Sequence, residues 1–385
     1  MSKILVAFEV KNNTTDNNIN SLLTVLSRME TDVQVIKSSR IEECHIQRCD
    51  VLILNRPNSI YSQEILKAAK KAGRYCVVSL DDDIINLPKS HPDYWKRKYT
   101  LACLGISDAL MSPNPLILAD YCAKNGLKPI RTNSFIEEKD LKSLHQVNEK
   151  LRVVYPAGRD HLPLFDKYIL PFFDSFISRY ANKIDVTFIG VQPKVNQSDS
   201  VHFIKGMPYK DYLEYMDSHE FDIGLAPLDD TPFCARKYFA KYFEYGKYGI
   251  MGLYSNVSPY TIAIEDGVNG LLVEDSIDAW ESALVKVVES PSIIVNITKK
   301  AQEDLKNSYS LDAVVQSLRN ECPELETFNG LEEKVEYGTS VLSKVRFELK
   351  SNCKKIVYHG RNEGLDGLCR IFLSKLGANT QAPLS

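Results

Sequence analysis

The chain has 385 residues, of which 44% are hydrophobic and 25% charged, so it is long and apolar enough for about two folded domains and too apolar for global disorder. Its formal net charge of −3 disfavours a role centred on nucleic-acid binding, which usually needs a basic surface. No apolar run approaches the roughly 18–20 residues of a membrane-spanning helix, and residues 1–10 lack the features of a signal peptide.

Strands and helices alternate through the first 80 residues. Apolar, strand-like runs lie at 3–10, 33–36, 50–54 and 75–80, and helix-like segments at 19–29 and 62–73. The run DVLIL at 50–54 is apolar almost throughout, as expected of a parallel strand covered on both faces. Ser62 as N-cap and Gly73 as the stop predict the limits of the second helix. This alternation predicts an α/β doubly wound sheet.

A second series of strands and helices begins near Arg152. Strands are predicted at 152–158, 186–190, 201–206, 222–227, 250–255 and 270–274, and helices at 164–180, 209–218, 237–248 and from 259 onward. The polar stretch 137–150 separates the two series. We therefore expect a first domain over 1–145 and a second, similar domain over 146–325.

Residues 326–385 are predicted to form a helical, partly basic C-terminal extension. The segment KVRFELKSNCKK at 344–355 mixes apolar side chains with five lysines and arginines. One interpretation is a solvated helix packed on the body of the protein. The other is an element that lies on a membrane surface or binds a partner.

The cysteines and histidines carry no metal-binding pattern. The nine cysteines are scattered without a CxxC pair, and the seven histidines form neither HxH nor HExxH. Free thiols of this kind are typical of a reducing compartment, so we expect a cytoplasmic protein without a zinc site.

The densest group of charged and aromatic residues lies between Ala226 and Asp275. If 237–248 is one helix, Lys237, Lys241 and Glu244 share a face at i, i+4 and i+7. Two ammonium groups suit a diphosphate, and a carboxylate suits the diol of a ribose. The alternative is a solvent-exposed cluster of charges with no ligand.

The segment 241–275 resembles the donor-binding half of the group 1 (family 4) glycosyltransferases of GT-B architecture. The matching residues are Lys241, Glu244, Tyr245, Gly249, Ser255, Asp266, Gly267, Gly270, Leu271, Leu272 and Val273. Weaker similarity extends over residues 1–320. The resemblance implies two facing Rossmann-like domains, the N-terminal one for the acceptor and the C-terminal one for a nucleotide-sugar donor.

The resemblance also implies donor contacts around the strand that opens the second domain. Gly158 and Arg159 follow this strand and match the family's Gly-Arg, whose arginine contacts the diphosphate. Glu244 would hold the ribose, while Lys237 and Lys241 would approach the phosphates. We expect Arg159 and Lys241 to be catalytic, because they would stabilise the charge of the leaving diphosphate.

Two further positions complete the expected donor site. Gly206 and Met207 match the segment whose backbone holds the base. Ser258 and Pro259 have the composition of an N-cap and first helical residue, and the N–H groups of a helix N-terminus can bind phosphate. A plain strand end and an ordinary helix start are the alternatives for these two positions.

In the first domain, Asp81, Asp82 and Asp83 follow the strand at 75–80, at the end where ligands bind to such sheets. Asp81 and Asp82 are candidates to orient hydroxyl groups or to act as a general base. Asp83 is expected on the acceptor side, together with Arg56 at the end of the preceding strand and Trp95 in an aromatic platform for a sugar. An acidic helix cap, a structural turn and a packed lid are the alternatives.

These observations predict a hexosyltransferase-like enzyme that moves a sugar from a nucleotide-sugar to a saccharide or lipid-linked saccharide. The resemblance implies retention of configuration and neither metal nor cofactor, and we expect a role in cell-envelope or exported polysaccharide synthesis. Peripheral membrane contact through the C-terminal extension would place the enzyme at the inner face of the membrane.

The chain also departs from the family pattern. Many members carry a glutamate eight residues before the one matched by Glu244, where this chain has Arg236, and Gly-Gly where it has Ser258-Pro259. A second hypothesis is therefore a non-catalytic GT-B subunit that binds saccharide or stabilises a partner enzyme. A third is a nucleotide-sugar epimerase of the same architecture.

Overall fold

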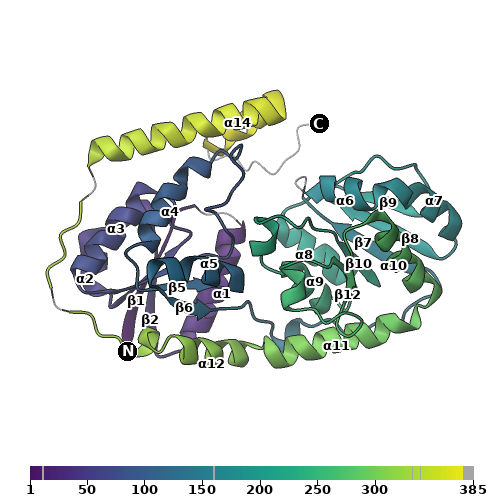
Figure 1. Ribbon diagram of the computed structural model, residues 1–385, viewed down its shortest axis with the longest axis horizontal. Coiled ribbons are helices and arrows are strands. Elements are labelled where there is room, and N and C mark those ends of the chain that lie inside the picture. The colour runs from purple at the N-terminus through teal and green to yellow at the C-terminus, as the bar shows by residue number, and fades with distance from the viewer. Residues whose placement is uncertain (11–12, 159–160, 332, 339, 376–385) are drawn as a thin grey trace. The chain divides into compact units, whose positions relative to one another are not determined.

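The computed structural model describes residues 1–10, 13–158, 161–331, 333–338 and 340–375, with backbone only at 13–17 and 359–375 (Figure 1). The chain forms two compact units. Unit 1 combines residues 1–134 with the chain from Val314 onward, and unit 2 comprises Phe135–Ala313. Within the described residues, no helix combines the length and the apolar character needed to cross a bilayer.

Unit 1 is built on a six-stranded parallel sheet with strand order β2-β1-β3-β4-β5-β6. Strand β1 lies between β2 and β3 and pairs with both, with Val6 opposite Val35 and Ile53. The strands are β1 (Ser2–Phe8), β2 (Thr31–Lys37), β3 (Val51–Asn55), β4 (Tyr75–Ser79), β5 (Ala109–Ser112) and β6 (Lys128–Arg131). The connecting helices are α1 (Asn13–Ser27), α2 (Glu43–Arg48), α3 (Ile60–Lys71), α4 (Arg97–Leu104) and α5 (Pro115–Asn125).

Helix α3 begins at Ile60, two residues before the predicted start. Its N-cap is Ser59, whose hydroxyl accepts a hydrogen bond from the Ser62 backbone N–H at 3.2 Å. The prediction of Ser62 as the N-cap was wrong. Serine is a favourable N-cap residue at either position, and only the extended backbone at Ser59 shows which serine precedes the helix. Gly73 does follow the helix, and its φ of +69° suits a residue without a Cβ.

Unit 2 contains a second six-stranded parallel sheet, with strand order β12-β11-β10-β7-β8-β9. The strands are β7 (Leu151–Pro156), β8 (Ile184–Ile189), β9 (Val201–Ile204), β10 (Ile223–Ala226), β11 (Met251–Ser255) and β12 (Leu271–Val273). The helices are α6 (Leu162–Tyr168), α7 (Leu170–Tyr180), α8 (Tyr209–Ser218), α9 (Ala240–Lys247), α10 (Ile277–Glu289) and α11 (Ser292–Ser308). Two doubly wound α/β units are therefore present, which confirms the predicted fold class.

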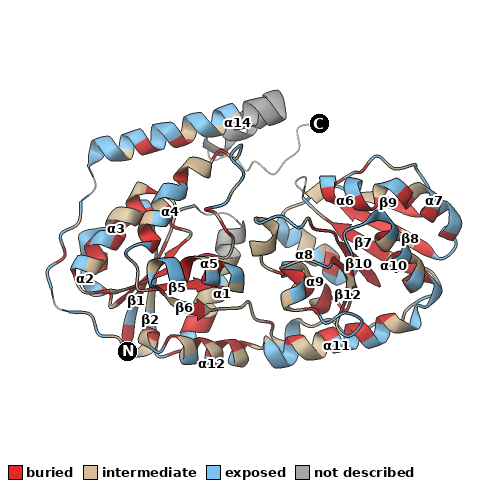
Figure 2. Ribbon diagram, viewed as in Figure 1, coloured by how far each residue is buried: buried red, intermediate tan, exposed pale blue. Residues whose placement is uncertain are grey.

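The inner strands of both sheets, such as β3 and β10, are entirely buried because helices cover both faces, as Figure 2 shows, whereas the edge strands β2, β6 and β9 are partly exposed. In unit 2 an aromatic cluster lies between the sheet and helices α6 and α7. The ring of Phe188 on β8 lies 5.0 Å from that of Phe165 and 5.7 Å from that of Phe173, measured between centroids. This cluster fixes α6 and α7 against the sheet.

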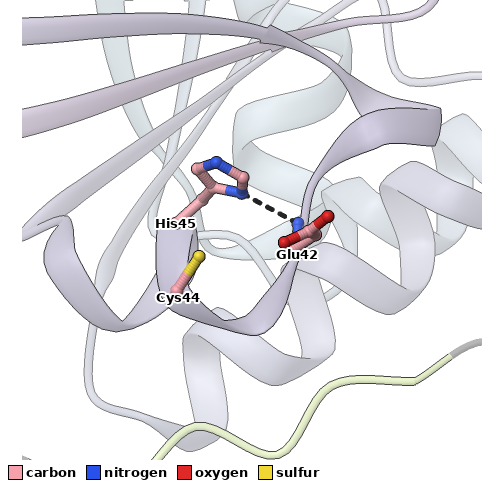
Figure 3. A group of neighbouring side chains, drawn as sticks. All are labelled: Glu42, Cys44 and His45. Carbon is pink, nitrogen blue, oxygen red and sulfur yellow. Dashed lines mark hydrogen bonds between the residues drawn. The ribbon is translucent and has the colours of Figure 1, made fainter.

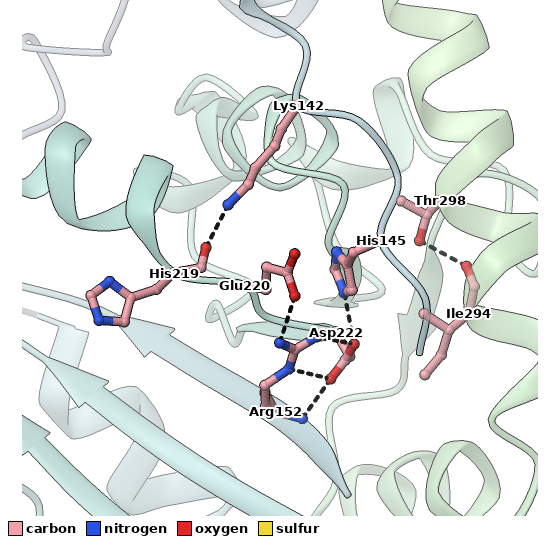
Figure 4. A network of polar contacts seen from close by, with 8 residues as sticks. All are labelled: Lys142, His145, Arg152, His219, Glu220, Asp222, Ile294 and Thr298. Carbon is pink, nitrogen blue, oxygen red and sulfur yellow. Dashed lines mark hydrogen bonds and ion pairs between the residues drawn. The ribbon is translucent and has the colours of Figure 1, made fainter. Parts of the chain in front are cut away.

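A buried ionic network attaches the segment before β7 to unit 2 (Figure 4). His145 Nε2 lies 2.7 Å from Asp222 Oδ1, and Arg152 donates from Nε and Nη2 to the two Asp222 oxygens at 3.1 Å each. Burial acts to raise the pKa of Asp222, but the hydrogen bonds from His145 and Arg152 outweigh it and hold that pKa below its usual value. The polar stretch predicted as a boundary thus belongs to unit 2, which begins at Phe135 rather than at residue 146.

The chain returns to unit 1 along α12 (Leu311–Glu321) and α13 (Glu324–Thr327). There the Lys128 ammonium on β6 lies 2.8 Å from Glu324, and Glu321 accepts a hydrogen bond from the Arg131 backbone N–H. The predicted second domain extended to residue 325, because a sequence of amphipathic helices does not show which sheet each helix covers.

The C-terminal extension is part of unit 1. Its first section is extended chain: Phe328 packs on Tyr75 with ring centroids 5.5 Å apart, and Val335 N–H donates to the Gln47 side chain at 2.8 Å. A single helix, α14 (Val341–Lys375), follows. The helical extension was predicted correctly, although its long helix begins at Val341 and not at the predicted boundary of residue 326.

The network around Asp222 gives a stability prediction. We expect Asp222→Asn to lower the free energy of unfolding by about 2–3 kcal/mol, because the partly buried guanidinium of Arg152 loses a fully buried charged acceptor. Folding lowers the pKa of Asp222, so its ionised carboxylate stabilises the folded state. This stabilisation is fully present above the unfolded-state pKa of about 3.9 and is lost as the pH falls through the lower folded-state pKa. Urea titrations at several pH values should show a constant deficit down to about pH 5 that narrows below pH 4.

The control is Glu303→Gln, which removes the exposed partner of Lys300, 2.7 Å away. That change should leave the free energy of unfolding close to that of the wild type, because an exposed ion pair contributes little. Equal effects of the two substitutions would show that the Asp222 network does not stabilise unit 2.

Candidate functional site

The sheet of unit 2 has a topological switch point between β7 and β10. The chain runs from β7 to β8 and β9 on one side, then crosses to β10, β11 and β12 on the other. In doubly wound sheets, ligands bind beyond the carboxyl ends of the strands at such a point, because the connections leave it in opposite directions. Gly158 follows β7, Met207 follows β9, Ser258 follows β11 and α9 begins after β10. The predicted donor residues therefore come from one edge of this sheet.

Glu244 is the centre of a polar group at this edge. The Lys241 ammonium donates to both of its carboxylate oxygens, at 2.9 and 3.1 Å. Tyr212 on α8 also donates its hydroxyl to Glu244 Oε1. Burial, with the Glu244 charge, raises the pKa of Tyr212, so its hydroxyl keeps the proton that it donates. The Lys241 and Glu244 side chains stay 28% and 23% exposed, which leaves both accessible to a ligand.

Tyr212 was not a predicted site residue. It lies in the aromatic-rich segment YKDYLEY, in the helix that follows Gly206 and Met207. Its proximity to Glu244 depends on the packing of α8 beside α9 and has no signal in the local sequence.

Lys237 does not share a helix face with Lys241, so that prediction was wrong. A short 3-10 turn over Cys234–Arg236 ends at Lys237, whose backbone is extended with φ −71° and ψ 168°. Helix α9 begins only at Ala240, after the non-helical Phe239, whose ring is buried in the core. The Lys237 ammonium lies over the Phe233 ring, 5.4 Å from its centroid.

Ser258 does not cap an α-helix, which corrects a second expectation. Its hydroxyl donates to the Ala235 carbonyl at 2.7 Å, and the Ser258–Pro259 peptide bond is cis. Only a three-residue 3-10 turn, Tyr260–Ile262, follows, without a side-chain cap. An α-helix N-terminus is therefore not available for phosphate at this point.

Of the remaining donor candidates, Gly158 is exposed after β7, and Met207 is half-buried against the core of unit 2. Arg159 lies outside the described residues, so its role stays a prediction.

Several residues that carry the family resemblance have structural roles. Asp266 accepts the Leu272 N–H at 2.8 Å, and Gly267 has a φ of +74°. A Cβ on Gly270 would lie 2.9 Å from side-chain atoms of Ile264 and Tyr254. This part of the motif forms the turn into β12, and it therefore reports the fold more directly than the chemistry.

Unit 1 has its own switch point, between β1 and β3, because β2 lies on one side of β1 and β3 to β6 on the other. Arg56 follows β3 and adopts a φ of +48°, which is uncommon for a residue with a Cβ. Its guanidinium donates Nε and Nη2 to Asp81 and lies 2.8 Å from Asp82. Asn18, on α1, also donates its side-chain amide to Asp81.

The structure thus brings Arg56, Asp81 and Asp82 together, as expected. It also places a guanidinium between the two carboxylates, which offsets part of their mutual repulsion. The Arg56 pKa itself is raised, since the nearby Asp81 and Asp82 charges outweigh the opposing effect of burial. A pair of carboxylates that shares one guanidinium keeps oxygen acceptors that are suited to hydrogen-bonding hydroxyl groups.

Asp83 and Trp95 have structural roles in place of the predicted acceptor contacts. Asp83 is fully buried and accepts hydrogen bonds from the backbone of Ile85 and from Tyr121, at 3.2 and 2.9 Å. The Trp95 ring packs 5.5 Å from that of Phe347 on α14. Neither role could be recognised from the sequence, because one depends on a distant tyrosine and the other on the C-terminal helix.

Glu9 is the site residue of unit 1 that the sequence analysis missed. It follows β1, on the other side of the switch point from Arg56. The hydroxyls of Ser59 and Ser62 donate to its carboxylate. Burial raises its pKa to about 7, against the opposing effects of Ser59 and Lys96. A single glutamate after an apolar run does not indicate burial, because its partners Ser59 and Ser62 lie about 50 residues away in the sequence.

One cluster in the described residues could hold a metal ion by its composition, although the sequence analysis predicted no metal site. Atoms of Glu42, Cys44 and His45 lie within 4.8 Å of one another at the start of α2 (Figure 3). His45 Nδ1 accepts the Glu42 N–H at 3.0 Å, and the Glu42 carboxylate accepts the His45 N–H in return. This reciprocal pair is a capping box, which explains the arrangement without a ligand.

Comparison with solved structures identifies the fold. The HepE protein of Anabaena, in complex with UDP and glucose, has a TM-score of 0.58 at 10% identity, covering 84% of this chain and 100% of that one. Sucrose-phosphate synthase from Thermosynechococcus elongatus scores 0.56 at 10% identity, covering 84% and 99%. A putative UDP-N-acetylglucosamine 2-epimerase from Listeria monocytogenes scores 0.55 at 10% identity, covering 88% and 99%.

No family model matches the sequence, and no curated protein sequence matches it either. At these identities the structural likeness establishes a common fold, the GT-B fold with its two Rossmann-like domains. The resemblance in the sequence to GT-B glycosyltransferases is thereby confirmed at the level of architecture.

The Glu9 environment gives a pH prediction. A carboxyl group whose folded-state pKa lies above its unfolded value destabilises the fold progressively as the pH rises from the unfolded to the folded pKa, here from about 4.5 to about 7. Glu9→Gln should therefore be close to neutral at pH 4.5 and stabilising by about 1–3 kcal/mol at pH 8. Thermal unfolding across this pH range measures the difference.

The exposed Glu43→Gln is the control and should show little pH-dependent difference from the wild type. A Glu9→Gln variant that is equally or less stable than the wild type at pH 8 would contradict a buried carboxylate at this position.

Proposed function

We propose that this protein is a glycosyltransferase that moves a sugar from a nucleotide-sugar to a saccharide or lipid-linked saccharide acceptor. One observation carries the proposal: the donor-binding residues predicted from the resemblance come from the carboxyl edge of the unit 2 sheet, on both sides of its switch point. The shared fold with proteins whose solved complexes contain UDP, glucose or UDP-glucose supports it.

Glu244 binds the ribose diol of the donor in this proposal. Its carboxylate is held by Lys241 and Tyr212 before any ligand arrives, so little conformational entropy remains to be lost on binding. The carboxylate has free lone pairs beyond these two donors, which can accept the ribose hydroxyls.

The positive charges stabilise the departing diphosphate. When the bond between the sugar and the diphosphate breaks, negative charge grows on the diphosphate oxygens, and the sugar forms a new bond to an acceptor hydroxyl, which loses its proton. Lys241, Lys237 and Arg159 are placed in this role by the resemblance, which also implies retention of configuration. No metal or cofactor is required, since fixed cations do the same electrostatic work.

The acceptor binds to unit 1. The Arg56, Asp81 and Asp82 group offers carboxylate oxygens to acceptor hydroxyls at the carboxyl edge of the sheet, opposite a guanidinium that keeps them in place. A lipid-linked acceptor agrees with a role in cell-envelope or exported polysaccharide synthesis at the cytoplasmic face of a membrane.

A non-catalytic subunit of the same fold is the second candidate, and Arg236 favours it. Arg236 stands where many family members have a glutamate, and its guanidinium donates to the Pro232 carbonyl at 2.7 Å. Such a subunit would bind a saccharide or nucleotide-sugar without turnover.

Donor binding tests both candidates by thermal shift against UDP-, GDP-, dTDP- and CMP-sugars. A ligand that binds only the folded protein raises the melting temperature by mass action. We expect a shift with one nucleotide class that is lost in Glu244→Ala and Lys241→Ala and retained in Lys247→Ala, a control at the far end of α9. A shift that survives both substitutions, or no shift with any donor, would reject the proposed site.

Turnover separates the candidates once a donor is known. Release of the nucleoside diphosphate that depends on an added saccharide supports transfer. Binding without turnover supports the non-catalytic subunit, and conversion of the donor without any acceptor supports an epimerase.

Tyr212→Phe gives a finer test of the same site. The ring is retained, so the fold should be unaffected, but Glu244 loses a hydroxyl donor. We expect the donor Kd to rise about tenfold, in the range for one hydrogen bond to a charged group. Calorimetric titration of the identified donor measures this, and an unchanged Kd would show that Tyr212 does not position Glu244.

A further inference from the structure

Helix α14 is attached to unit 1 by a single stripe of its surface. Phe347 and Ser351 are its buried residues among those whose side chains are described. The Phe347 ring lies 6.1 Å from that of Tyr61 and 5.4 Å from that of Tyr99, between centroids. Tyr61 also donates its hydroxyl to Glu348, the next residue of α14, at 3.3 Å. The helix is therefore docked firmly along one line.

The opposite face of α14 is apolar and exposed. Of the seventeen large hydrophobic side chains that are exposed in the described part of the chain, six lie within residues 341–357. Their exposed fractions range from 42% to 75%. They are Val341, Leu342, Val345, Leu349, Ile356 and Val357. At 100° per residue, all of them except Val357 fall on one side of the helix, at least about 120° from Phe347.

Positive charge flanks this apolar face. Residues 341–358 contain five basic side chains and one acidic side chain, Glu348. At 100° per residue, Arg346 and Lys355 lie about 40° beyond the two edges of this face. Lys344 and Lys350 lie over rings of unit 1, at 5.6 Å from the centroid of Tyr61 and 4.7 Å from that of Trp95. An apolar face with basic borders is typical of helices that lie in the plane of an anionic membrane surface.

We propose that the outward face of α14 binds the surface of a bilayer containing anionic lipids. Charge complementarity selects this occupant over a second copy of the chain, because two copies of a segment with five basic and one acidic side chain repel each other. The helix lies on the membrane and does not cross it, in agreement with the lack of a spanning helix among the described residues.

The contact between Phe347 and Tyr61 links α14 to the part of unit 1 that is proposed to bind the acceptor. This step rests on the proposed function. Tyr61 lies in the first turn of α3, which begins at the carboxyl edge of the unit 1 sheet, after Arg56. Phe347 on Tyr61 thus ties the membrane helix to the sheet edge that carries Asp81 and Asp82. Lipid binding by α14 brings this edge to the bilayer, where a lipid-linked acceptor resides.

Vesicle co-sedimentation of the full chain tests the proposal. The probes are phosphatidylcholine vesicles with and without phosphatidylglycerol. The variant carries Leu342→Ser, Val345→Ser, Leu349→Ser and Ile356→Ser, which changes the outward face and leaves Phe347 in place. The matched control carries Leu101→Ser, Ile106→Ser, Leu116→Ser and Val295→Ser, four exposed apolar positions outside α14.

We expect the wild type and the control to bind the anionic vesicles, more weakly at high salt, and the α14 variant to bind at least about tenfold less at an unchanged melting temperature. Equal binding by the variant, or no preference for phosphatidylglycerol, would overturn the proposal. The proposal would also be overturned if the wild type did not bind vesicles but formed a dimer in sedimentation velocity that the α14 variant did not form. The donor-induced thermal shift, measured on the same proteins, reports the proposed function separately.

Discussion

Parallel strand pairing imposes the constraint from which the rest of this structure follows. Every strand of both sheets pairs in parallel with its neighbours, so each connection must return to the starting edge through a crossover. The carboxyl ends of all strands in a unit consequently lie at one edge. Glu9, Arg56 and Asp81 come to one edge in unit 1, and Lys241 and Ser258 to another in unit 2, although they lie far apart in the sequence.

The charged groups at both edges are paired before any ligand is present. Arg56 pairs with both Asp81 and Asp82, and Lys241 is bound to Glu244. These pairs remain partly exposed, so their strength is modest and a ligand with matching groups can exchange with them. The Asp222 network, with a fully buried carboxylate, is of a different kind and holds the fold.

The sequence predicted the elements whose pattern is local and repeated. The apolar strands, the division into two α/β series and the grouping of Arg56 with Asp81 needed only periodicity and the rule that loops at carboxyl ends meet. Lys237 and Ser258 were misplaced because a buried aromatic, Phe239, and a hydroxyl bond to Ala235 override the local helix signal. Tyr212, Glu9 and the partner of Trp95 were missed because each depends on contacts between distant segments.

The route of the chain has a consequence for how the protein is made. Unit 2 is a continuous stretch whose ends meet, since Ile136 pairs with Ser310 and its N–H donates to the Tyr309 carbonyl at 2.8 Å. Unit 1 is interrupted by it and receives Glu324 and Val335 only after unit 2 has been synthesised. During translation, unit 2 can therefore fold as soon as it emerges, while the first 134 residues wait with an unfinished surface for the end of the chain. In topological terms unit 2 is a continuous domain inserted into the chain of its host, and the return to the host lies within helix α12.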